Sequence, residues 1–84
     1  VVNKIGLSIF PNPFSKTTIV KVGDVAKYNT ITIALYDLLG KKVGEYPLTA
    51  NETIIARGDL ANGVYVYKVI GDNDILSTGR VVIK

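Results

Sequence analysis

Apolar and polar residues alternate along most of this chain with a period of two, which is typical of strands that bury one face. The clearest example is residues 30–36. There Ile31, Ile33 and Leu35 alternate with smaller or more polar side chains. A helix over residues 25–39 is disfavoured, because Thr, Ile and Tyr dominate and the apolar repeat is two rather than 3.6.

Six further segments carry a strand pattern between turn residues: 5–9, 17–22, 41–46, 53–56, 64–70 and 75–84. Residues 64–70 are apolar on both faces, which predicts a central strand that is covered on each side. Gly79 is expected to form a bulge in the last strand. About seven strands, with turn signals roughly every 8–12 residues, predict an all-β, immunoglobulin-like sandwich of two antiparallel sheets.

The turns carry recognisable chemistry. Pro11 and Pro13 flank Asn12 and should stop the first strand, because each proline fixes φ and removes a ladder donor. Residues 37–40 connect a hairpin, and Gly40 is suited to a positive φ.

Tyrosines inside strands have two interpretations. In immunoglobulin-like sandwiches, a tyrosine near the start of strand F donates a hydrogen bond to the backbone at the E–F corner. Tyr65, just after the corner at residues 60–63, lies where that role requires it. It could equally be a strand tyrosine packed on the core. Tyr36 and Tyr67 are interpreted as core residues.

Length and composition restrict the chemistry. Eighty-four residues make one domain, and no apolar run approaches the roughly 20 residues that span a bilayer. The chain lacks histidine and cysteine, the usual general base and the most nucleophilic side chain, so we expect no enzyme and no cofactor. The net charge of +3 is dispersed, which does not favour nucleic-acid binding.

Three short motifs invite functional interpretations, but turn chemistry explains each of them. Arg-Gly-Asp at residues 57–59 matches an integrin-binding tripeptide, and Asn-Glu-Thr at residues 51–53 matches a glycosylation sequon. Asp-Asn-Asp at residues 72–74 offers oxygen ligands to calcium, yet no further acidic residue follows at a suitable distance.

Four segments together resemble the C-terminal sorting domains of type IX secretion in Bacteroidetes. In chain order they are Phe-Pro-Asn-Pro-Phe-Ser with Thr-Ile-Val (10–15 and 18–20), Leu-Tyr-Asp-Leu-Leu-Gly-Lys-Lys-Val (35–43), Leu-Ala-Asn-Gly-Val-Tyr-Val-Tyr-Lys-Val (60–69) and Gly-Arg-Val-Val-Ile-Lys (79–84). Phe10 stands where the family usually has tyrosine. The residues that serve as family markers are Pro11, Asn12, Pro13, Tyr36, Asp37, Gly40, Gly63 and Tyr65. A related module of flagellar hook-capping proteins shares the opening and the Gly-Val-Tyr corner.

The resemblance implies an address label. A cargo protein would reach the periplasm by a signal peptide and present this domain to the outer-membrane translocon. A sortase-like protease would then remove the domain, leaving the cargo secreted or on the cell surface. Residues 1–6 would be a linker remnant. Recognition would fall on Val81, Val82, Ile83 and Lys84, read by edge pairing and capture of the terminus. Alternatively, these residues simply complete a sheet.

Two further hypotheses concern partners. The domain could be a carbohydrate-binding or adhesion module of a secreted enzyme, which exposed aromatic rings on one sheet face or a groove at the loop ends would favour. An unpaired edge strand would also favour a weak homodimer.

Overall fold

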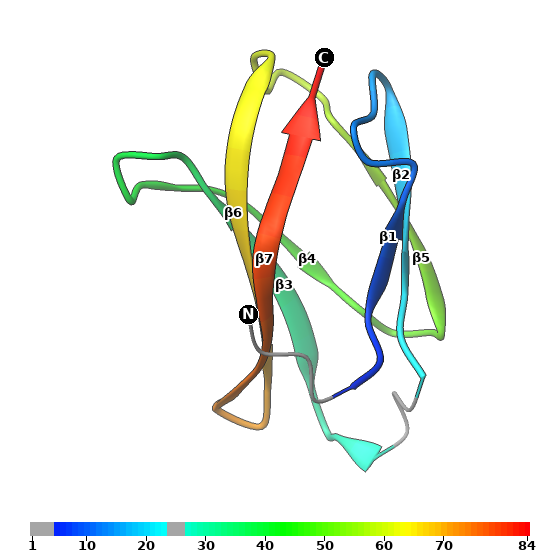
Figure 1. The fold of residues 1–84 in the computed structure, drawn as a ribbon. Coiled ribbons are helices and arrows are strands. Elements are labelled where there is room, and N and C mark those ends of the chain that lie inside the picture. Colours follow the sequence, from blue (N-terminus) through cyan, green and yellow to red (C-terminus); the bar gives the residue numbers. More distant parts are fainter. Residues whose placement is uncertain (1–4, 24–26) are drawn as a thin grey trace.

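The computed structural model describes residues 5–23 and 27–84, which form two facing sheets (Figure 1). The strands are β1 (Ser8–Phe10), β2 (Thr17–Lys21), β3 (Ile31–Tyr36), β4 (Lys42–Pro47), β5 (Glu52–Ala56), β6 (Gly63–Gly71) and β7 (Asp74–Ile83). One antiparallel sheet has the order β1-β2-β5, and the other has the order β4-β3-β6-β7. The predicted sandwich of about seven strands is confirmed.

The period of two places the core as predicted. Ile31, Ile33 and Leu35 of β3 are buried, whereas Thr32 and Tyr36 on the other face are half-buried; Ala34, also on that face, departs from the alternation because it is 2% exposed.

β6 lies between β3 and β7, which confirms that it is central in its sheet, but the prediction that both its faces are covered is wrong: Tyr65 and Val69 are buried, whereas Val64 on the other face is 36% exposed. The two neighbours of β6 occupy both hydrogen-bonding edges.

The interior contains two groups of buried side chains. The larger group lies around Ile33 and Val69, which are 1% and 0% exposed. The second, here called the C-terminal cluster, consists of Phe14, Leu35, Tyr65, Val81 and Ile83. Three partly buried side chains contact both groups and join them: Ile9, Tyr46 and Tyr67.

The predicted bulge at Gly79 is wrong. Gly79 pairs in regular register with Tyr67, and the register shift lies between Val69 and Ile70, opposite Leu76. The extra residue there, Leu76, is buried in the core. Gly79 has another reason to lack a side chain, because a Cβ at this position would lie 2.6 Å from the Tyr67 hydroxyl oxygen. The tyrosine ring therefore covers the glycine across the strand pair.

Candidate recognition surface

The loop after β1 and the end of β7 are hydrogen-bonded to each other. The Asn12 side chain donates from Nδ2 to the Arg80 carbonyl over 3.1 Å and accepts at Oδ1 from the Val82 amide over 3.0 Å. Thr18 steadies the loop from the neighbouring strand by donating from Oγ1 to the Pro11 carbonyl over 2.7 Å. The first and last family motifs therefore meet at one end of the sandwich.

Phe14 continues this contact through its backbone. Its amide donates to the Val82 carbonyl over 2.9 Å, and its carbonyl accepts from the Lys84 amide over 2.9 Å. A parallel bridge pairs Phe14 with Ile83. The outer edge of β7 between Arg80 and Lys84 is therefore already paired within the domain.

The four predicted recognition residues fall into two kinds. Val81 and Ile83 are 2% and 1% exposed and belong to the C-terminal cluster. Val82 is half-buried and Lys84 is exposed. Only the second pair presents side chains that a partner could contact without unfolding the domain. Completion of the sheet, the alternative interpretation, is what Val81 and Ile83 do.

The marker residues Asp37 and Gly40 build the β3–β4 hairpin loop. The Asp37 carboxylate accepts from the amides of Leu39 and Lys41, each over 2.9 Å, and the Asp37 amide donates to the Lys41 carbonyl over 2.9 Å. Gly40 has a φ of 89°, which confirms the predicted positive value. The loop is thus fixed from within, in the manner of an Asx turn.

Tyr36 does not belong to the core, contrary to the prediction. It follows the inward-facing Leu35 and therefore lies on the outer face of its sheet, opposite Lys42. The ammonium nitrogen of Lys68 lies 5.0 Å from the centre of its ring. Lys42 itself pairs with Glu45 over 2.9 Å, and this hydrogen bond and charge raise the pKa of Lys42.

Both interpretations of Tyr65 are correct at the corner that contains Gly63. Gly63 begins β6, and the Tyr65 hydroxyl donates to the Ala61 carbonyl over 2.6 Å. This contact confirms the tyrosine corner. The ring is 7% exposed and packs in the C-terminal cluster, so Tyr65 is a core residue as well.

Arg57 has a structural role that the sequence pattern did not reveal. Its Nε and Nη2 donate to the Leu60 carbonyl over 3.1 and 2.8 Å. Nη1 donates to the Ser15 carbonyl over 3.1 Å, and Nη2 donates to Asn62 Oδ1 over 2.7 Å. Because the guanidinium is occupied internally, it is not displayed as adhesion through Arg-Gly-Asp would require. Local spacing gave no signal of these contacts.

The Asp72–Asp74 motif forms a turn, as the preferred interpretation held. Asp72 and Asn73 have φ values of 50° and 72°, as in the tight turn of a two-residue hairpin. The Asp72 carboxylate accepts from the amides of Asn29 and Thr30, at 3.0 and 3.1 Å. Within residues 5–23 and 27–84, no group of three metal-ligating side chains occurs. In the same ranges, no helix is long and apolar enough to cross a membrane.

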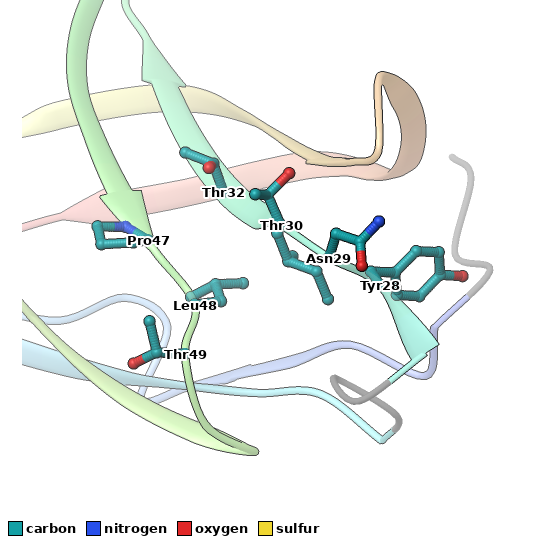
Figure 2. Close-up of a pocket in the computed structure, with 8 residues that line it drawn as sticks. Tyr28, Asn29, Thr30, Thr32, Pro47, Leu48 and Thr49 are labelled. Atoms are coloured by element: carbon teal, nitrogen blue, oxygen red, sulfur yellow. The ribbon is translucent and has the colours of Figure 1, made fainter.

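A groove of about 390 Å³ lies at the opposite end of the sandwich from the C-terminus (Figures 1 and 2). Threonine hydroxyls and the apolar side chains of Pro47 and Leu48 line it. Tyr28 is the one aromatic ring among the described residues of its lining, and that ring is half-buried against the core. The aromatic platform expected of a carbohydrate-binding module is therefore not formed here.

Comparison with known proteins identifies the family. A family model described as a secretion system C-terminal sorting domain matches residues 8–84. A search of curated proteins finds no match. The match covers all four motifs and decides between the sorting domain and the hook-capping module. The family is a sorting signal rather than a catalytic one. This chain therefore belongs to the type IX secretion C-terminal sorting domains, which direct the proteins that carry them to export, for release or for attachment to the cell surface.

Proposed function

We propose that partner proteins read this domain in its folded state, through a surface formed by the Pro11–Pro13 loop and the end of β7. The observation that carries the proposal is the set of hydrogen bonds from Asn12 and Phe14 to the backbone between Arg80 and Lys84. They hold two distant family motifs together in one place. The domain itself performs no chemistry.

The side chains at this surface suit a protein partner. Arg80 and Lys84 are exposed, as are Pro11 and Pro13, and Phe10 just before the loop is 46% exposed. Aromatic and arginine side chains are enriched at the centres of protein interfaces. Two cations beside apolar side chains call for an acidic, partly apolar partner surface. We assign that surface to the outer-membrane translocon.

The sortase-like protease would act before the domain. The linker predicted for residues 1–6 mostly lies outside the described residues, since residues 1–4 are not described. Ile5 is 6% exposed and packs in the core, and its carbonyl accepts from the Gly23 amide over 3.1 Å. We therefore propose that the cut precedes Ile5, which stays with the domain.

Deletion of residues 81–84 would be a poor test of recognition. It would remove Val81 and Ile83 from the core, and losing two buried aliphatic side chains costs several kcal/mol, on the order of a small domain's whole stability. Loss of export would then report unfolding as readily as a lost contact. Substitutions at exposed positions avoid this ambiguity.

The test uses a fluorescent reporter with an inner-membrane signal, fused to residues 1–84 in a type IX-competent host. Its variant carries Arg80→Glu and Lys84→Glu, and its matched control carries Lys16→Glu and Lys21→Glu, which are also exposed but lie on or beside β2. Both should melt alike by circular dichroism. We expect the first pair to lower the exported signal at least severalfold and the control to leave it unchanged. Equal export by both, or an equal loss, would refute the proposed surface.

Self-association stays a prediction. Contacts with Asn12 and Phe14 cover the β7 edge between Arg80 and Lys84, and the other edge strands in the described part of the chain are β1, β4 and β5. Sedimentation at millimolar concentration should show a weak dimer. A single monomeric species at that concentration would contradict it.

A further inference from the structure

Two leucines project from the tip of the β3–β4 hairpin, which extends away from the sandwich (Figure 1). Leu38 is 70% exposed and Leu39 is 95% exposed. Most of the apolar surface of each side chain is therefore in water, although burying that surface would be favourable in free energy. Nothing in the fold of the domain requires these positions to be aliphatic.

The loop holds both leucines outward in a defined geometry. The Asp37 carboxylate fixes the amides of Leu39 and Lys41, and the Gly40 amide donates to the Asp37 carbonyl over 3.1 Å. A loop fixed in this way cannot fold its leucines back onto the sheet without breaking these bonds. The tip is thus pre-organised to present an apolar point.

Basic side chains surround the base of this tip. Lys41 and Lys42 follow the leucines after Gly40, and the Lys68 ammonium lies over the Tyr36 ring. The two nearby carboxylates are engaged, since Asp37 accepts from the loop amides and Glu45 pairs with Lys42. Three lysines (Lys41, Lys42 and Lys68) therefore outnumber two carboxylates (Asp37 and Glu45) at this corner.

A shallow hollow of about 280 Å³ lies behind the tip, on the outer face of the sheet. Its lining consists of Tyr36, Asp37, Leu38, Gly40, Val66 and Lys68, so the hollow presents a carboxylate as well as an ammonium. One corner of the molecule therefore carries the apolar tip, the lysines beside it and the hollow.

We infer that this hairpin tip inserts into the surface of an anionic phospholipid bilayer. The leucines would enter the region of the acyl chains, and Lys41 and Lys68 would lie at the level of the headgroup phosphates. A bilayer fits better than a protein interface, because leucine is under-represented at the energetic centres of protein interfaces and lysines beside an apolar tip suit anionic headgroups. The contact is brief and reversible, because two side chains give far less than an anchor. This contact is additional to the proposed reading by the translocon.

The first test measures co-sedimentation of the whole chain with vesicles. Vesicles of equal parts phosphatidylglycerol and phosphatidylcholine should bind it, and pure phosphatidylcholine should bind it more weakly. Leu38→Ser with Leu39→Ser should lower the partition coefficient by about tenfold or more. Lys41→Gln should weaken binding to the anionic vesicles alone. The matched control is Ile54→Ser, since Ile54 is 71% exposed but lies on β5 of the other sheet.

A second test locates the inserted residue. The chain has no tryptophan, so Leu39→Trp introduces a single indole at the tip. Its emission should shift to the blue on adding anionic vesicles, whereas that of Ile54→Trp should not. Absent vesicle binding by the unmodified chain, or equal losses from the tip and Ile54 variants, would overturn the inference. Reduced export of the tip variant without vesicle binding would also overturn it, in favour of a protein contact. Vesicles contain no translocon, so this outcome is independent of the export assay.

Discussion

The Asn12 side chain takes the place of a neighbouring strand for Val82, 70 residues later in the chain, by accepting from its amide while donating to the Arg80 carbonyl. A carboxamide presents one acceptor and two donors, so a single side chain can satisfy both a strand amide and a strand carbonyl. The prolines on either side hold this amide in position without offering backbone donors of their own.

Removing that side chain should loosen the end of β7. We expect Asn12→Ala to lower the free energy of unfolding by about 1–2 kcal/mol, because two edge groups lose their partner to water. Urea denaturation measures this change, and hydrogen exchange at the Val82 amide should accelerate. Asn51→Ala is the control, since Asn51 is exposed and bonds to Val22 through its backbone carbonyl. Unchanged protection at Val82 would contradict the role of Asn12.

Arg57 should matter for its geometry rather than its charge. Arg57→Lys keeps the charge but cannot reach Ser15, Leu60 and Asn62 together, so we expect a loss of about 1–3 kcal/mol in unfolding free energy. Asp59→Glu, which destroys the Arg-Gly-Asp motif, should leave stability within about 0.5 kcal/mol. Thermal melts of the two variants test this directly. An Asp59→Glu variant as unstable as Arg57→Lys would show that the tripeptide acts as a unit.

The contact of Gly79 with Tyr67 calls for a double-mutant cycle. Gly79→Ala should destabilise the domain by about 1–3 kcal/mol, because the new Cβ would meet the tyrosine ring. In a Tyr67→Leu background the same substitution should cost much less, leaving a coupling energy of about 1 kcal/mol or more. Additive effects in chemical denaturation would mean that the ring moves aside freely.

One buried hydroxyl should be dispensable. Ser77 is 1% exposed, and its Oγ has no hydrogen-bond partner in the part of the chain that the structure describes. We expect Ser77→Ala to raise the free energy of unfolding by about 1 kcal/mol, since an unsatisfied buried group is removed at little cost in volume. Thr18→Val should instead lower it, because the bond to the Pro11 carbonyl is lost. A destabilised Ser77→Ala would reveal a bound water.

Local chemistry explains why much of the fold was predictable. The period of two in β3 and the apolar faces of β6 can be recognised from consecutive residues. The same is true of the Asp37–Gly40 loop and of the corner before Tyr65. Each depends on interactions within a few positions of the chain. Sequence patterns of this length therefore gave the strands and the sandwich.

What could not be predicted depends on pairing between distant residues. Nothing near Asn12 or Arg57 indicates which backbone groups their side chains reach, and the bridge between Phe14 and Ile83 follows from the assembled sheets. The prediction of a bulge at Gly79 was wrong for the same reason, because the glycine is required by a tyrosine ring on another strand. The proposed recognition surface belongs to this long-range class: resemblance to the family suggested its residues, but not their geometry.

The bridge between Phe14 and Ile83 also has a kinetic consequence. It closes a loop of almost the whole chain, and because closing so long a loop costs entropy, we expect this contact to form late in folding. The proposed recognition surface would then be among the last parts of the domain to assemble. A receptor that binds this surface would select chains whose folding is complete.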